Sequence, residues 1–217
     1  MSAQHLASAV ALLVATSAAM AQNAPPVAPD QALSGAVDVR LSRVYARIGK
    51  LGWDHEHAAE GRLLSGNVQL GASERAGELV FDAASFLADT QDARRAFDLP
   101  GTVHASIREK ITRQIFSRGV LDADHFPQAV FRIRSALPAG APRADGGGEY
   151  RLDGELALHG VNRPLRIVVL VEPINDRWRV RGECKIKLGE FDIHPPEHKL
   201  GKPAGSLDIE GDLWLQR

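Results

Sequence analysis

The chain contains a single cysteine, Cys184, among its 217 residues. One thiol cannot form an internal disulfide, so a folded domain has to be stable through its own hydrophobic core. Metal sites built from paired cysteines are excluded for the same reason. Cys184 lies on the apolar side of an expected strand, so we expect a buried, unreactive thiol rather than a nucleophile or a bridge between two chains.

An excess of charge of one sign and long hydrophobic runs are also missing. Lys and Arg number 26 against 27 Asp and Glu, for a net charge of −1, and no basic stripe is visible. This balance argues against nucleic acid or an anionic membrane surface as a partner. No stretch is apolar and uncharged for long enough to span a bilayer as a helix, so we expect a soluble mature protein without stable membrane insertion.

Common signatures of catalysis are absent as well. The sequence has no nucleophile elbow, no phosphate-binding glycine loop and no paired-cysteine metal motif, and its acidic residues form no close pair by spacing. Enzymatic activity is therefore not the leading hypothesis, and no catalytic residue is predicted.

The first 21 residues have the pattern of a cleavable export signal. Leu6–Ala15 is a short, mostly apolar run and Ala19-Met-Ala21 fits the small-x-small cleavage site, although the segment before the run lacks Lys and Arg. A disordered, alanine-rich tail is the alternative. Residues 22–35, with three prolines, are typical of an extended linker. Residues 36–217 remain, which is enough for one domain with a full core.

Strand signals dominate the second half of the chain. Residues 150–158, 177–188 and 207–216 alternate between apolar and polar side chains with period two, which predicts strands with one dry and one wet face. Less regular alternation predicts further strands at residues 37–48, 65–70, 78–86, 131–134 and 165–172, with a weakly patterned strand over 53–64. Both faces of the strand at 165–172 are apolar near its middle, so we expect both to be covered. Turn residues at 160–164 and 175–176 join neighbouring strands.

One segment, bounded by Thr102 as an N-cap and Gly119 as a stop, is expected to be helical. Its apolar residues recur every four positions from Val103 to Ile115, which gives a narrow stripe that slants around the helix. Such a stripe suits a helix that lies across the mouth of a barrel better than one inside a bundle.

Seven to eight mostly antiparallel strands joined by short turns predict an up-and-down barrel or a sandwich. We favour the barrel, because closing the sheet removes the exposed edges that such long strands would otherwise present. The expected fold class is therefore all-β: an antiparallel, up-and-down, lipocalin-like barrel of about eight strands with one helix near its mouth.

The dry faces form the first candidate site. Gly154, Gly182 and Gly211 lie in the middle of three strands, where either a ligand approaches the backbone or the barrel bends. A barrel of this size holds either packed side chains or one small ligand. The apolar side chains predicted to line the interior are Phe81, Phe131, Leu156, Val180, Cys184, Ile186, Ile209 and Leu213.

The second candidate site is the histidine cluster in Trp53-Asp-His-Glu-His57. On a strand His55 and His57 share one face and could present two imidazoles to a metal. A hydrated barrel rim, in which both rings bond backbone or carboxylate groups, is the alternative. His159, on a wet face just before a turn, is expected to have a structural role there.

Four segments taken together resemble the YceI-like family of proteins. They are Leu79-Val-Phe-Asp-Ala-Ala-Ser-Phe86, Val120-Leu-Asp-Ala-Asp-His-Phe-Pro-Gln-Ala-Val-Phe131, Leu152-Asp-Gly-Glu-Leu-Ala-Leu-His-Gly-Val-Asn-Arg-Pro-Leu165 and Leu188-Gly-Glu-Phe-Asp-Ile193. The resemblance implies a lipocalin-like barrel, export to the bacterial periplasm, and an apolar tunnel that holds a polyisoprenoid or a quinone tail. The sequence departs from the family pattern at the Trp53–His57 motif and over residues 89–119, both where a tunnel mouth is expected.

The leading hypothesis is thus a periplasmic protein that binds an apolar lipid, a polyisoprenoid or an isoprenoid-quinone-like amphiphile; the sequence indicates no certain cofactor. One alternative is a metal- or histidine-dependent enzyme at the barrel rim that uses His55 and His57. The other is a packed barrel that acts as an interaction partner of a membrane redox protein. A homodimer is a further partner consistent with the sequence.

Overall fold

The computed structural model describes residues 33–49, 56–141, 143–195 and 205–217. The expected signal peptide, most of the expected linker and His55 lie outside the described residues. The elements are, in chain order, β1 (Leu33–Ala36), β2 (Arg43–Ile48), β3 (His57–Leu70), β4 (Gly77–Ala88), α1 (Gln91–Ala96), α2 (Ala105–Phe116), β5 (Gln128–Pro138), β6 (Gly148–Leu158), β7 (Val161–Ile174), β8 (Arg177–Lys187), the 3₁₀ turn η2 (Leu188–Phe191) and β9 (Ser206–Gln216).

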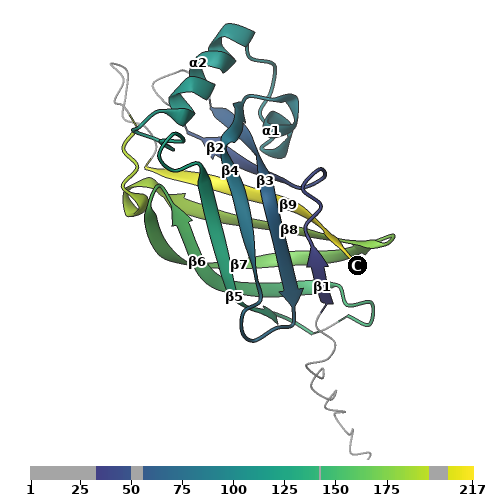
Figure 1. The fold of residues 1–217 in the computed structure, drawn as a ribbon. Coiled ribbons are helices and arrows are strands. Elements are labelled where there is room, and N and C mark those ends of the chain that lie inside the picture. The colour runs from purple at the N-terminus through teal and green to yellow at the C-terminus, as the bar shows by residue number, and fades with distance from the viewer. Residues whose placement is uncertain (1–32, 50–55, 142, 196–204) are drawn as a thin grey trace, which may run out of the picture.

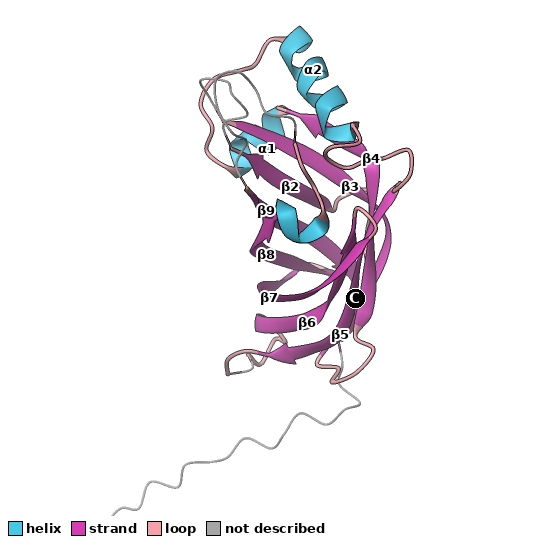
Figure 2. Cartoon of the chain, turned by 90° about the vertical axis from the view of Figure 1, so that its left-hand side faces the viewer, coloured by secondary structure: helices cyan, strands magenta, loops and turns pink. Residues whose placement is uncertain are grey.

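The strands close into a barrel. From β2 to β9 each strand pairs antiparallel with the next, and β9 pairs back onto β2, where Glu210 lies opposite Tyr45. This ring has eight strands, and β1 extends it by pairing with the far end of β3. Figure 1 shows the barrel with α2 across one end, and Figure 2 shows the same arrangement from the side. The expected all-β, antiparallel barrel with a helix near its mouth is confirmed.

The first strand differs from its prediction. Residues 37–48 were expected to form one strand, but a turn at residues 38–42 separates β1 from β2. Asp38 builds that turn, because its backbone carbonyl accepts from the Ser42 amide at 3.0 Å and its carboxylate accepts from the Arg40 amide at 3.0 Å. The buried Ser42 hydroxyl then accepts from the Trp214 amide at 2.9 Å, which fixes the turn against β9.

The weak pattern predicted over residues 53–64 has a structural cause. The described part of that segment belongs to one long strand, β3, which continues to Leu70. Its register against β4 shifts twice, between Glu60 and Arg62 and between Leu63 and Ser65. Each irregularity interrupts the alternation of inward and outward side chains, so no clean period of two is left in the sequence.

Strand β7 corrects two predictions. Val168 and Leu170 were expected to be covered but are 50% and 37% exposed on the outer wall, because α1 packs against β2 and β3 instead. The turn before β7 consists of His159 and Gly160 alone, not residues 160–164. Pro164 falls within the strand, in the part that pairs only with β6, where a missing N–H is tolerated.

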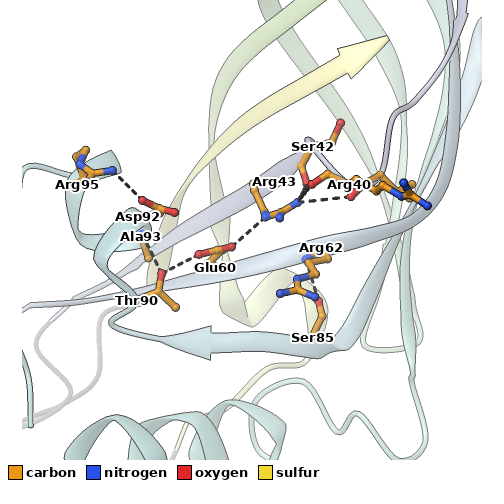
Figure 3. Close-up of polar contacts among 11 residues, drawn as sticks. Arg40, Ser42, Arg43, Glu60, Arg62, Ser85, Thr90, Asp92, Ala93 and Arg95 are labelled. Carbon is orange, nitrogen blue, oxygen red and sulfur yellow. Dashed lines mark hydrogen bonds and ion pairs between the residues drawn. The ribbon is translucent and has the colours of Figure 1, made fainter. Parts of the chain in front are cut away.

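Two helices lie at one end of the barrel. Helix α2 begins one residue after His104, whose imidazole accepts from the Ser106 amide, so the predicted cap at Thr102 is wrong by two residues. The shorter helix α1 was not predicted. Its N-cap Thr90 accepts from the Ala93 amide at 3.0 Å and donates to Glu60 at 2.8 Å, and Glu60 pairs with Arg43 at 3.0 Å (Figure 3).

This chain of contacts attaches α1 to the outer face of β2 and β3. Among the described residues, no helix has the length and apolar character needed to cross a membrane.

Candidate ligand-binding cavity

The barrel encloses an apolar cavity of about 220 Å³ that extends from the inner strand faces to α2. Its wall takes side chains from every strand of the ring, β2 to β9, and from the inner face of α2. Apart from the thiol of Cys184, the lining side chains with polar atoms are Gln114, Gln128 and His159. The strand alternation explains this composition, because one face of each strand turns its apolar residues inward.

The structure brings all of the predicted lining residues to this wall. Phe81, Phe131 and Leu156 come from β4, β5 and β6, while the remaining ones come from β8 and β9 and are Val180, Cys184, Ile186, Ile209 and Leu213. Six of these eight positions belong to strands whose period-two pattern was unambiguous in the sequence, which is why their direction could be predicted.

Helix α2 closes one end of the cavity. Ile111 and Ile115 are 0% and 6% exposed and pack in one cluster with Ile48, Ala59 and Ala88 from the strand ends. Both isoleucines also face the cavity. The apolar stripe of the predicted helix is therefore the face of α2 that covers this end of the cavity. The predicted lining did not include it, because that prediction considered strands alone.

The three inward glycines do not share one role. A Cβ on Gly154 would lie 2.2 Å from the Arg132 carbonyl oxygen, so close approach of β5 excludes a side chain there. A Cβ on Gly182 would meet a Val169 methyl at 2.7 Å. A Cβ on Gly211 would find only the Gly182 carbonyl at 3.8 Å, and Gly211 lines the cavity. Of these three glycines, Gly211 is therefore the one that leaves open space inside the barrel.

The wall has a seam between β7 and β8. These strands pair only from Val169 to Ile174 on β7, so residues 161–168 of β7 and 183–187 of β8, all within the described part of the chain, are not paired with each other. Leu165 and Ile167 on one side and Cys184 and Ile186 on the other line the cavity. The cavity thus reaches a place in the ring where backbone pairing is interrupted; the end of β4, after Asp82, is likewise not paired with β5.

Cys184 was expected to be buried but is only partly buried, and this partial burial still controls its chemistry. It raises the pKa of the thiol to about 11, so the thiol stays protonated at neutral pH. A protonated thiol inside an apolar wall is a poor nucleophile and a poor metal ligand.

His57 is not on a hydrated rim. It is fully buried, and its Nδ1 lies 2.7 Å from Asp89 Oδ2. Asp89 also accepts from the Arg94 guanidinium at 2.9 Å and from the Ala58 amide at 3.3 Å. Burial alone would raise the pKa of Asp89, but hydrogen bonds and charge from His57, then Ala58 and Arg94, hold it below its usual value. This cluster joins the start of β3 to the end of β4 and to α1.

Of the two histidines proposed as metal ligands, only His57 belongs to the described residues. His55 lies outside the described residues, and among those that the structure describes no group of three His, Cys, Asp or Glu side chains could hold a metal ion. His57 contacts Asp89 through Nδ1. It therefore belongs to a buried hydrogen-bond network and does not lie on an open face.

His159 lines the cavity, although it was assigned to a wet face. The tight turn rotates its ring away from the alternation of β6, and the Phe126 ring packs against it with centroids 5.0 Å apart. The sequence contained a signal that His159 is unusual. In a two-residue hairpin turn whose second residue is glycine, the first residue is usually Asn, Asp or Gly, but here it is His.

A family model described as YceI-like domain matches residues 36–212. The structure is similar to that of Burkholderia cenocepacia BcnA, with 19% identity, a TM-score of 0.54, and coverage of 82% of this chain and 98% of that one. It is also similar to a polyisoprenoid binding domain from Saccharophagus degradans implicated in plant cell wall breakdown, with 14% identity, a TM-score of 0.58, and coverage of 86% and 99%. No curated protein matches the chain.

Proposed function

Because the chain belongs to the YceI-like family, we propose that it is an exported, periplasmic protein that binds a lipid with a long apolar tail in its barrel. The proposed ligand class is a polyisoprenoid or an isoprenoid quinone. The name of the Saccharophagus degradans relative supports the first of these classes, since that protein is a polyisoprenoid binding domain.

The observation that carries the proposal is an apolar cavity of about 220 Å³ inside the barrel, which the chain's own side chains leave open. An engineered cavity of about 150 Å³ with apolar walls stays dry and accepts benzene. A larger one with a similar wall is therefore suited to hydrocarbon, and each buried methylene would contribute about 0.8 kcal/mol.

Mass spectrometry of organic extracts tests the proposal directly. Protein purified from the periplasm of its own host should carry a prenyl lipid in repeated preparations. Delipidated protein should bind added prenyl lipids with a rise in its melting temperature. Empty preparations together with no thermal response to any prenyl lipid would refute the carrier function.

Gly211 offers a matched variant for the same experiment. Gly211→Leu places a side chain into the open space without a backbone clash, so the fold should persist while roughly four carbons of ligand are excluded, which weakens binding by about 100-fold. Gly140→Leu is the control, because Gly140 also has open space around it but lies in the exposed loop after β5. Equal loss of binding in both variants would show that the effect is not due to the cavity.

Export is tested separately. Expression of the full chain in a Gram-negative host, followed by fractionation and N-terminal sequencing, should give periplasmic protein that begins at Gln22. Uncleaved protein retained in the cytoplasm would overturn this part of the proposal.

A further inference from the structure

The imidazole of His159 is held in a defined orientation at the cavity wall. His159 and Gly160 form the two-residue turn between β6 and β7, with φ of 51° and 76°. The Phe126 ring packs on both, since a Cβ on Gly160 would lie 2.7 Å from it. On its other side, His159 Nδ1 lies 3.2 Å from the backbone carbonyl of Phe191. The turn, the ring and the carbonyl together fix where the second nitrogen lies.

That carbonyl also decides the tautomer. A carbonyl oxygen only accepts hydrogen bonds, so Nδ1 carries the hydrogen and donates it. In the neutral imidazole Nε2 is then an acceptor that needs a donor. Nε2 is buried, with less than 1 Å² accessible, and has no hydrogen-bond partner among the described residues. Buried polar atoms are nearly always paired, so an acceptor without a protein partner beside an apolar cavity points to a group supplied from outside the chain.

The wall around His159 limits what that group can be. No Lys or Arg side chain lines the cavity as described, so an anionic phosphate head would have no counter-charge there. A quinone offers only carbonyl acceptors and cannot donate to Nε2. An alcohol, a phenol or a hydroquinone donates an O–H and carries no charge.

We propose that His159 Nε2 accepts a hydrogen bond from a hydroxyl on the head of the bound lipid, so that the barrel selects prenyl alcohols or prenyl hydroquinones over the matching hydrocarbon, phosphate and quinone. This inference rests on the proposed lipid-binding function. Because Nε2 is shielded, a neighbouring group has to move for the hydroxyl to reach it. The Phe126 ring lines the cavity and packs against the imidazole with centroids 5.0 Å apart, so it is a neighbour whose movement would expose the ring.

Competition binding with one tail and several heads tests the selection. A prenyl alcohol, the hydrocarbon of equal length, the monophosphate, and a quinone and hydroquinone with that tail are each titrated against delipidated protein. A net hydrogen bond to a buried acceptor corresponds to about tenfold in affinity, so the alcohol should bind about tenfold more tightly than the hydrocarbon, and the hydroquinone more tightly than the quinone.

The variant His159→Asn removes the ring while keeping the turn, because Asn-Gly is the preferred pair for such a hairpin. It should remove the advantage of the alcohol, so that alcohol and hydrocarbon bind the variant with equal affinity. Thermal unfolding of the same sample verifies that the variant is folded.

The outcomes distinguish the role of His159 from the lipid-binding function on which it rests. If the natural protein binds the hydrocarbon and the alcohol equally, or if His159→Asn weakens both by the same factor, His159 is only a structural part of the turn. Tighter binding of the phosphate than of the alcohol would also overturn the assignment. If no compound of the series binds at all, both the inference and the lipid-binding function fail.

Discussion

The buried cluster of His57, Asp89 and Arg94 allows a quantitative test of what holds the mouth of the barrel together. Asp89 has a positive φ of 48°, a conformation that Asn tolerates nearly as well as Asp. Asp89→Asn therefore removes the charge with little backbone strain. The variant keeps one acceptor oxygen but loses the carboxylate opposite His57 and Arg94, whose side chains are 0% and 9% exposed.

Removing one partner of a buried ion pair costs roughly 3–5 kcal/mol, because the other charge stays buried without compensation. Arg94 retains bonds to the backbone carbonyls of Pro100 and Gly101, so we expect the lower end, about 3 kcal/mol. For a domain of this size that corresponds to a fall in melting temperature of roughly 6–12 °C. Thermal unfolding at pH 7, followed by circular dichroism, measures it.

Asp92→Asn, three residues further along the chain in α1, is the control. Its partner Arg95 lies 2.8 Å away, but the two side chains are 61% and 67% exposed, so the loss should be about 1 kcal/mol or less. If Asp89→Asn is no less stable than this control, the buried cluster does not stabilise the fold and the reasoning fails.

The pH dependence gives a second check on Asp89. A carboxyl whose pKa is lowered on folding contributes stability above its unfolded pKa, and this contribution is lost as the pH falls through the folded pKa. The difference between the natural protein and Asp89→Asn should therefore be full at neutral pH and shrink below pH 3.8, the usual value for Asp. A difference that is unchanged in strong acid would contradict the assignment of Asp89 as the ionised partner.

Three further outcomes follow from the packing. Gly154→Ala should lower stability by about 1–3 kcal/mol because its Cβ would lie 2.2 Å from the Arg132 carbonyl, whereas Gly211→Ala should be close to neutral in urea unfolding. Cys184, with a thiol pKa of about 11, should react with iodoacetamide at pH 8 far more slowly in the folded protein than in urea, and bound lipid should slow it further; rapid labelling of the native state would contradict its burial. Ile111→Ala should cost about 2–5 kcal/mol, and a loss below 1 kcal/mol would mean that α2 does not pack on the barrel.

The sequence predicted the wall of the barrel well because β6, β8 and β9 follow one simple rule. Inward positions on these strands, such as Leu156, Val180 and Leu213, alternate with mostly charged positions, so their direction could be predicted without knowledge of the fold. Where a strand departs from regular pairing, as β3 does at its two register shifts, the alternation fails and so did the prediction.

The arrangement of side chains at the mouth of the barrel depends on contacts between segments that are far apart in the sequence. Such contacts produce no pattern in the nearby sequence. Nothing near His57 in the chain identifies Asp89 or Arg94 as part of its buried cluster, since His57 and Asp89 are 32 positions apart. His159 was assigned to the wrong face because it belongs to the turn after β6. Its positive φ ends the alternation of side chains, so the period-two rule does not give its direction. Helix α1 was missed because six residues are too few for a helical period to appear.

The seam between β7 and β8 has a mechanical consequence. Where two strands are paired, widening the barrel would break backbone hydrogen bonds, but residues 161–168 of β7 and 183–187 of β8 share none that could be broken. These two segments can therefore move apart while β7 stays paired with β6 and β8 with β9. A bound molecule wider than the cavity would meet less resistance from the backbone here than between fully paired strands.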